Sequence, residues 1–309
     1  MDEKKTGLVV KAAGSLYTVQ DAASGARCEC KIRGKLRLRD TRTTNPLAVG
    51  DVVRYEAGHA PVVTELIPRR NYIIRKATNL SKEAHIVAAN VDQAFLMVTA
   101  DFPRTSVEFI DRFLVSAEAY KIPVSIVIAK MDLYNGERLQ AAAHMEATYS
   151  AIGYQVLKTS IRVEDTVSAI KSLLADKITL FSGNSGVGKS SLINALNPQL
   201  KLRVGEISEY HNKGKHTTAF SEMFEVGKNS YVIDTPGIKG FGLVDIEPHE
   251  LSHYFTEIFA ASRACKFANC THVHEPDCAV QEAVEKGKIS RHRYVSYLKM
   301  LEGDEKYRR

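Results

Sequence analysis

The chain has 309 residues, of which 44% are hydrophobic and 25% charged, and its formal net charge is +6. This length and composition predict a folded protein of two to three domains that buries a substantial core. No apolar run approaches the roughly 18 residues that span a bilayer, and none follows the charges at the amino terminus. We therefore expect a cytoplasmic protein that does not interact with membranes.

The first 70 residues predict a small β-barrel. Short β-like runs alternate with glycine, asparagine and proline turn residues, and the runs cover residues 8–10, 16–19, 27–33, 52–55 and 62–67. This spacing is typical of a five-stranded barrel of the OB type, whose open face commonly binds RNA.

Basic residues are concentrated in one stretch of this predicted barrel and are opposed only by Asp40. We predict that they bind RNA, because clustered positive charge favours a polyanion as partner: Lys31, Arg33, Lys35, Arg37, Arg39 and Arg42. The alternative is a solvated face of a strand or loop.

Residues 71–245 predict an α/β domain with a parallel sheet, because apolar runs alternate with amphipathic helical windows. The predicted strands are residues 91–99, 124–129, 155–158, 178–181 and 231–233, and the predicted helices are 107–120, 137–151, 166–174 and 189–196. Residues 246–309 predict helices around a cysteine-rich loop. We thus expect three domains, at 1–70, 71–245 and 246–309.

A phosphate-binding loop is predicted between the strand ending at 181 and the helix beginning at 189. The sequence there fits G-x-x-x-x-G-K-[ST], and the predicted nucleotide-binding residues are Gly183, Asn184, Ser185, Gly186, Val187, Gly188, Lys189, Ser190 and Ser191. Backbone N–H groups of such a loop face the phosphates, Lys189 reaches the outer phosphates, and Ser190 coordinates Mg²⁺. The alternative, a glycine-rich turn without a ligand, is disfavoured by the flanking strand and helix.

A second carboxylate for the metal is predicted at Asp234, which begins the run Asp-Thr-Pro-Gly after a strand. The N–H of Gly237 in this run is expected to meet the γ-phosphate. The polar loop Gly-Lys-His-Thr-Thr at 214–218 lies where a switch segment would contribute a threonine to Mg²⁺. Thr218 is the first candidate for this ligand and Thr217 the second.

A guanine-binding site is predicted after two further strands. Asp132 can accept hydrogen bonds from both the N1–H and the exocyclic amine of guanine, and the stem of Lys130 can cover the ring. Thr159 and Ser160 fit the loop that closes over the guanine O6. Ala129 occupies the place where the usual Asn-Lys-x-Asp motif has asparagine, so we expect weaker nucleotide binding with the preference for guanine retained.

The order of these motifs is circularly permuted. Ordinary GTPases place the phosphate-binding loop before the base motif, whereas here Lys130, Asp132, Thr159 and Ser160 precede it. A parallel sheet tolerates this rearrangement when its natural ends lie close together. The permutation leads the switch-bearing half directly into the carboxy-terminal segment, so nucleotide state could be transmitted there.

A structural zinc site is predicted near the carboxy terminus. Cys265, Cys270, His272 and Cys278 supply the closed Cys₃His set of tetrahedral zinc, with His274 as an alternative ligand. Buried cysteines or a disulfide are the other interpretations, which a cytosolic chain with a clustered histidine disfavours. Cys28 and Cys30, without a histidine nearby, are expected to pack in the barrel.

These features together resemble the circularly permuted ribosome small subunit-dependent GTPase A (RsgA/YjeQ) family over essentially the whole chain. The Gly-Lys-His-Thr-Thr loop and the zinc spacing are the most specific parts of the resemblance. It implies a GTPase with one structural Zn²⁺ and with Mg²⁺ bound alongside GTP or GDP. We expect a monomer, because no exposed apolar helix stands out in the sequence. Such a protein would bind the 30S subunit late in assembly, assist 16S rRNA maturation, and leave after GTP hydrolysis.

Hydrolysis requires an aligned water, and the residue after the Asp-Thr-Pro-Gly glycine is isoleucine rather than glutamine. His216 is the candidate for orienting this water, by its chemistry and by the family resemblance. It could instead order the loop or contact rRNA. Two other functions stay open: a P-loop ATPase or small-molecule kinase, and an RNA-binding zinc protein whose nucleotide site is a clamp of little catalytic activity.

Overall fold

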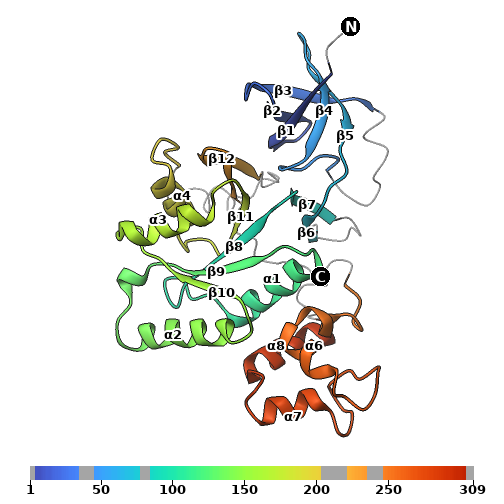
Figure 1. Ribbon diagram of the computed structural model, residues 1–309, viewed down its shortest axis with the longest axis vertical. Coiled ribbons are helices and arrows are strands. Elements are labelled where there is room, and N and C mark those ends of the chain that lie inside the picture. The colour runs from blue at the N-terminus through green and yellow to red at the C-terminus, as the bar shows by residue number, and fades with distance from the viewer. Residues whose placement is uncertain (1–3, 35–44, 77–83, 203–220, 235–245, 304–309) are drawn as a thin grey trace, which may run out of the picture.

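The computed structural model describes residues 4–34, 45–76, 84–202, 221–234 and 246–303. A β-barrel, an α/β domain and a helical segment follow one another along the longest axis of the molecule (Figure 1). This arrangement confirms the predicted fold class, an OB-type barrel, a permuted P-loop domain and a carboxy-terminal helical domain with a cysteine and histidine cluster. Among the described residues, no helix is long and apolar enough to cross a membrane.

The barrel is closed by five strands near the predicted positions: β1 (Lys4–Ala13), β2 (Leu16–Asp21), β3 (Arg27–Ile32), β4 (Val52–Glu56) and β5 (Val62–Leu66). The pairing runs β1–β2–β3–β5–β4 and returns from β4 to β1, with β3 and β5 parallel. Alternate residues of β2 are buried, which directs Tyr17 and Val19 into the barrel core. Cys30 is fully buried in the same core, so its predicted packing role is confirmed.

The central sheet continues from the barrel in the order β12–β13–β11–β8–β9–β10, with all neighbours parallel except β12 and β13. Its strands and helices are β8 (Gln93–Val98), α1 (Val107–Ala119), β9 (Val124–Ile128), the 3-10 helix Met131–Leu133, α2 (Gly136–Ser150), β10 (Gln155–Lys158), α3 (Glu164–Leu173), β11 (Ile178–Ser182), α4 (Lys189–Leu196), β12 (Glu222–Gly227) and β13 (Ser230–Asp234).

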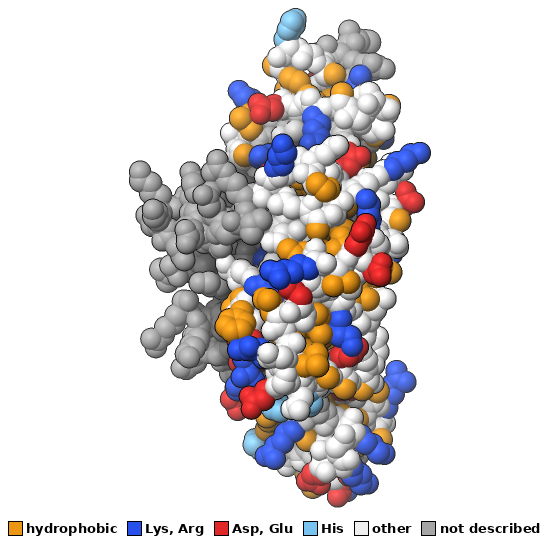
Figure 2. Space-filling view, turned by 90° about the vertical axis from the view of Figure 1, so that its left-hand side faces the viewer, with side chains coloured by type: hydrophobic (Ala, Val, Ile, Leu, Met, Phe, Trp, Pro, Cys, Tyr) orange, Lys and Arg blue, Asp and Glu red, His pale blue; other side chains and the backbone are white. Residues whose placement is uncertain are grey.

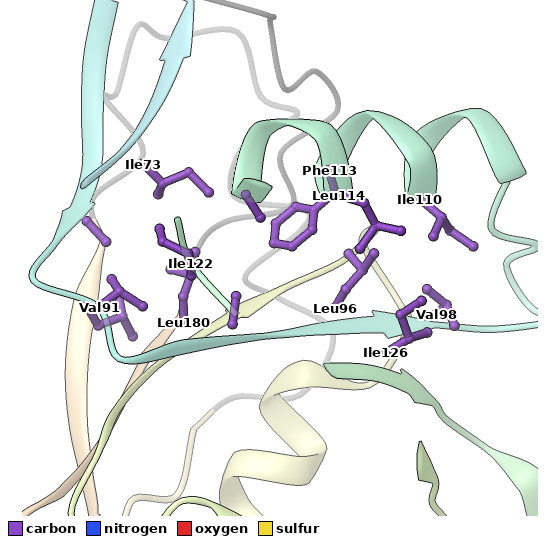
Figure 3. Close-up of a cluster of buried hydrophobic side chains, with 14 of the residues drawn as sticks. Ile73, Val91, Leu96, Val98, Ile110, Phe113, Leu114, Ile122, Ile126 and Leu180 are labelled. Atoms are coloured by element: carbon purple, nitrogen blue, oxygen red, sulfur yellow. The ribbon is translucent and has the colours of Figure 1, made fainter. Parts of the chain in front are cut away.

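Helices cover both faces of this sheet because its central strands are apolar on both sides. Leu96 and Val98 of β8 belong to the core cluster with α1 and α2, and Figure 3 shows them facing Ile110 and Leu114 of α1. The intervening Met97 belongs to the opposite cluster, with α3 and α4. This two-sided burial explains why β8 reads as a continuous apolar run rather than an alternating one.

A hairpin that the sequence pattern did not predict lies between the barrel and β8, formed by β6 (Tyr72–Lys76) and β7 (Ala84–Ala89). The predicted strand at 91–99 is accordingly shorter, because Asn90, at a φ of 54°, separates β7 from β8. Arg69, between the barrel and this hairpin, binds to the barrel, because its guanidinium forms two hydrogen bonds, of 2.7 and 2.8 Å, with the buried Asp51. A Cβ at Gly50 would lie 2.0 Å from the carbonyl oxygen of Ala89, so the hairpin packs directly on the barrel.

The barrel and the central sheet also join through β12, another strand absent from the prediction. Lys11 of β1 pairs in register with Glu222 of β12, and their side chains form a 3.0 Å ion pair. Gln20 donates a hydrogen bond to the hydroxyl of Tyr231 on β13. The division into domains at residues 70 and 245 stays a prediction.

The carboxy-terminal segment packs beneath α1 and consists of the 3-10 helix Leu251–Tyr254 and three helices, α6 (Thr256–Ser262), α7 (Ala279–Glu285) and α8 (Arg291–Glu302) (Figure 1). Its core includes Phe255, Val280 and Tyr297. Val115 of α1 belongs to the same core, so α1 is shared between the central sheet and this segment.

A buried ion network fixes this contact. Arg293 of α8 is 1% exposed and donates to Asp111 of α1 at 2.8 Å and to Glu257 of α6 at 2.7 and 3.0 Å. Tyr149 of α2 also donates to Asp111, and the guanidinium lies 4.6 Å from the ring centre of Phe255. The network therefore joins two helices of the central domain to two helices of the carboxy-terminal segment.

We expect Arg293→Met to lower the free energy of unfolding by about 3–5 kcal/mol, because it leaves two buried carboxylates without their cation. Denaturant unfolding followed by circular dichroism measures this loss. Lys299→Ala is the matched control, since it breaks an exposed ion pair with Glu108 between the same two helices and should cost less than about 1 kcal/mol. Equal losses in both variants would contradict the role given to the buried network.

Candidate nucleotide site and metal cluster

The predicted phosphate-binding loop connects β11 to α4, as the sequence indicated. Gly183, Gly186 and Gly188 have φ values of 147°, 80° and 105°, in the region that side chains other than glycine rarely adopt. A Cβ at Gly183 would also lie 2.4 Å from the carbonyl oxygen of Met97, so the loop passes directly against β8. The glycines thus allow the backbone curvature that turns N–H groups toward a phosphate.

Lys189 and Asp234 are both buried at the base of this loop. The ammonium of Lys189 donates to the carbonyl oxygens of Gly183, at 2.7 Å, and Asn184, at 3.1 Å. Asp234 ends β13, the strand beside β11, and its Oδ1 atom is buried without a hydrogen-bond partner among the described residues. Lys189 is therefore held by loop carbonyls, and a carboxylate oxygen remains available for a ligand.

Burial dominates the electrostatics of both groups. It raises the pKa of Asp234 to about 6, although the positive charge of Lys189 opposes the shift. It also lowers the pKa of Lys189, against the attraction of Asp234. A buried carboxylate with an oxygen free of hydrogen bonds suits a hard cation such as Mg²⁺, and Ser190, at the first turn of α4, supplies a hydroxyl of the kind that completes such sites.

Lys130 links the base-binding loop to the phosphate-binding loop. Its ammonium donates to the carbonyl oxygen of Gly186 at 2.7 Å and to that of Phe102 at 2.6 Å. The residue has a φ of 62° and lies directly after β9. The lysine stem is thus stretched between two loops, which is the placement needed to cover a base.

Asp132 lies beside Ser160, as predicted for the two parts of a guanine site. The Ser160 hydroxyl donates to Asp132 Oδ1 at 2.7 Å, and Thr159 and Ser160 are both nearly fully buried. The Nε of Arg162, which the sequence interpretation did not single out, lies 3.4 Å from Asp132 Oδ2. The position of Arg162, two residues after Ser160 in the sequence, could have indicated that it lies at this site.

Ala129 is buried in the apolar cluster that also contains Val187 of the phosphate-binding loop. Apolar packing therefore occupies the place where the asparagine of the usual motif would form hydrogen bonds. The side chain of Asn184 forms no hydrogen bond with the described residues, so it does not substitute for that asparagine. The direct polar connection between the base loop and the phosphate loop is made by Lys130.

A third loop at this edge of the sheet was missed by the sequence interpretation. It follows β8, and a Cβ at Gly186 would lie 3.5 Å from the Cδ of Pro103. Phe102 is 54% exposed, and its ring lies 4.6 Å beneath the guanidinium of Arg138. The sequence could have predicted this loop, because it follows a predicted parallel strand and the carboxyl ends of parallel strands meet at one edge of the sheet.

Several predicted site residues lie outside the described part of the chain: Lys35, Arg37, Arg39, Arg42, His216, Thr217, Thr218 and Gly237. Of the basic set, Lys31 and Arg33 are described and exposed, and Arg33 forms a 2.7 Å ion pair with Glu56. Figure 2 shows basic and acidic side chains interspersed over one long face of the molecule. Charge of a single sign therefore does not dominate that face.

The four predicted zinc ligands come together in the carboxy-terminal segment, where their ligand atoms all lie within 4.8 Å of one another: Cys265, Cys270, His272 and Cys278. The Sγ atoms of Cys270 and Cys278 are 3.7 Å apart, and the Nδ1 atom of His272 lies 3.5 Å from the Sγ of Cys278. Sulfurs about 2.3 Å from a tetrahedral zinc are separated by about 3.8 Å. The cluster fits zinc in its dimensions and in its donor set.

The backbone of the ligand loop is held by α8 and by one glutamate. Tyr294 and Tyr297 of α8 donate to the carbonyl oxygens of His272, at 2.5 Å, and Thr271, at 2.8 Å. Glu275 accepts hydrogen bonds from the backbone and hydroxyl of Thr271, which lower the pKa of its carboxyl group well below its usual range. Such contacts around the ligands orient them for the metal.

Asp234→Asn should stabilise the protein in the absence of nucleotide and Mg²⁺ above pH 6. The pKa of Asp234 rises from 3.8 to about 6 on folding, so the folded state binds the proton more tightly and ionisation costs stability as pH rises through this interval. We expect a gain on the order of 2 kcal/mol at pH 8 that shrinks toward pH 4. Denaturant unfolding at several pH values measures it.

Asp165→Asn, which changes an exposed carboxylate of α3, is the control for this experiment and should show no such pH-dependent gain. The same Asp234→Asn protein should lose Mg²⁺-dependent nucleotide binding. A loss of stability at pH 8 would show instead that the attraction to Lys189 outweighs the cost of burial.

Purified protein should contain about one zinc per chain, and Cys278→Ser should lose it, because removing one of four ligands opens the tetrahedral set. Elemental analysis measures the metal content. Cys28→Ser, a barrel cysteine whose Sγ is 3.6 Å from that of Cys30, is the control and should retain the zinc. Zinc loss in the control, or a wild-type protein without zinc, would contradict the assignment.

Comparison with known proteins identifies the family of the chain. The family model described as RsgA GTPase matches residues 66–244, and the one described as RsgA N-terminal domain matches residues 6–60. The small ribosomal subunit biogenesis GTPase RsgA 2 of Bacteroides thetaiotaomicron is 55% identical over 98% of each chain. A protein with the corresponding name from Flavobacterium johnsoniae is 48% identical over 98% of this chain and 95% of its own.

Two solved structures share the fold. YjeQ from Thermotoga maritima is 38% identical with a TM-score of 0.78 and covers 97% of this chain and 98% of its own. YloQ, described as a circularly permuted GTPase, is 34% identical with a TM-score of 0.73, covering 97% and 94%. Family, fold and motif order agree along nearly the whole length, and the chain belongs to the RsgA family of circularly permuted GTPases.

Proposed function

We propose that the protein hydrolyses GTP in association with the 30S ribosomal subunit, assists late assembly of that subunit and maturation of its 16S rRNA, and leaves after hydrolysis. The observation that carries the proposal is the carboxyl end of the parallel sheet, where the phosphate-binding loop follows β11, Asp132 follows β9 and Asp234 ends β13. The chain is also 55% identical to a named small-subunit biogenesis GTPase. We infer that it acts as a cytoplasmic monomer.

We assign the nucleotide contacts from this geometry. Asp132, held by Ser160, accepts from guanine, while the stem of Lys130 covers the base. Lys189 leaves the loop carbonyls to which it now donates and binds the outer phosphates, because their negative charge is the stronger partner. The remaining loop residues, from Gly183 to Ser191, surround the phosphates with their N–H groups.

Mg²⁺ would be held by Ser190 and Asp234, with Thr218 as a further ligand, and would offset charge on the phosphates. The raised pKa of Asp234 means that protons compete with the cation below pH about 6. Zinc in the Cys₃His cluster would be structural, because four protein ligands leave no open position for a substrate.

His216 is proposed to orient the attacking water, since the Asp-Thr-Pro-Gly run is followed by isoleucine. A water-orienting residue placed outside that run predicts slow hydrolysis by the isolated protein. Binding to the partner would then complete the site. Lys31 and Arg33 of the barrel, with the neighbouring basic residues up to Arg42, are proposed RNA ligands.

Phosphate release should be accelerated by purified 30S subunits with GTP and not with ATP, because Asp132 distinguishes guanine from adenine. His216→Ala should lose most of this stimulation, by about 10²- to 10⁴-fold if the imidazole contributes as general bases do, while retaining nucleotide binding. His144→Ala, an exposed histidine of α2, is the control and should behave as wild type.

The absence of any 30S stimulation in the wild type would contradict the ribosomal assignment. Full stimulation of His216→Ala would leave the ribosomal assignment intact and remove His216 from the catalytic step. ATP hydrolysis equal to that of GTP would contradict the role of Asp132.

A further inference from the structure

We propose that the exposed ring of Phe102 is a stacking platform for an unpaired RNA base, which places RNA directly beside the nucleotide site. This inference rests on the proposed function and deepens it by naming a contact residue. Phe102 belongs to the loop after β8, outside the basic segment of the barrel and outside the zinc cluster.

Arg138 and Asp101 hold Phe102 in place. The guanidinium of Arg138 lies 4.6 Å from its centre, and the same guanidinium forms a 2.8 Å ion pair with Asp101. Asp101 also accepts a hydrogen bond from the backbone N–H of Phe102 at 2.9 Å. The ring nonetheless remains 54% exposed, the largest fraction among the exposed apolar side chains of the described residues.

The backbone of Phe102 is fixed as well. Its carbonyl accepts from Lys130, and the next residue, Pro103, packs against Gly186. Its φ of 58° lies in the left-handed region, where glycine or asparagine is the ordinary choice. Neither backbone preference nor core packing accounts for a bulky aromatic residue at this position.

The surrounding charge indicates the class of partner. Arg104, two residues on, is exposed and forms no ion pair with the described residues. Arg138 adds a second guanidinium, which is paired with Asp101. A rigid aromatic face bordered by arginines binds single-stranded nucleic acid, because the ring stacks on a base while the cation meets the phosphate.

The alternative partner of the ring is an apolar surface of another protein. Stacking distinguishes an RNA base from such a surface, because it requires the flat face of an aromatic side chain. A leucine at position 102 retains apolar area but has no π face, whereas a tryptophan retains the face. The hydrogen bond to Lys130 uses the main-chain carbonyl, which every one of these variants keeps.

The experiment measures the affinity of the protein for 30S subunits in the presence of a non-hydrolysable GTP analogue. Phe102→Ala and Phe102→Leu should both weaken binding, by about 5- to 100-fold, the range expected for one stacked base. Phe102→Trp should bind within about twofold of wild type, and Arg104→Gln should weaken binding and reduce its salt dependence. Leu139→Ala, which removes a 50% exposed side chain beside Arg138, is the control and should have no effect.

Wild-type affinity in Phe102→Leu would identify a protein contact and overturn the proposal, as would wild-type affinity in Phe102→Ala. A matching loss of affinity for a fluorescent GDP would place the ring in the guanine site and also overturn it. A single-stranded oligoribonucleotide provides a second probe. If the wild type fails to bind 30S, the proposed function fails, while binding to the oligoribonucleotide that depends on Phe102 would still support the stacking role.

Discussion

The buried guanidinium of Arg293 determines how the carboxy-terminal helices are placed against the central domain. It neutralises Asp111 on α1 and Glu257 on α6, and its removal would leave both carboxylates buried without a cation. Such a network gives little net stability over apolar packing, yet it tolerates only one arrangement of its members. The carboxy-terminal helices are therefore fixed in orientation against α1 rather than merely attached to it.

Because α1 is shared, this constraint also relates the phosphate-binding loop to the cluster of cysteines and histidine. The loop before α1 contacts Lys130 and Gly186, and α8 carries Arg293 together with the two tyrosines that hold the backbone of the zinc-ligand loop. A continuous series of packed groups thus connects the phosphate-binding loop to the cysteine cluster. The circular permutation adds a covalent connection, because β13, which ends at Asp234, precedes the carboxy-terminal segment directly in the sequence.

Burial makes the charged forms of Asp234 and Lys189 unfavourable, so these two residues lower the stability of the folded protein when no ligand is bound. Burial raises the pKa of Asp234 and lowers that of Lys189, so each group is held in the state its surroundings disfavour. GTP and Mg²⁺ provide the opposite charges. Shifted pKa values of this kind are common at functional sites. At Ala129, by contrast, apolar packing takes the place of a polar group.

The sequence by itself determined the motif chemistry and most element positions, because glycine placement, hydrophobic period and ligand spacing are local properties. It identified the barrel strands, the loop from Gly183 to Ser190, and the four residues of the cysteine and histidine cluster. Only the tertiary structure decided which distant groups meet: Arg69 with Asp51, Lys130 with Phe102, and Arg293 with Asp111. The sequence did not predict the short strands β6, β7 and β12. Their own residue pattern does not define them, because they form through pairing with partner strands and attachment to the barrel.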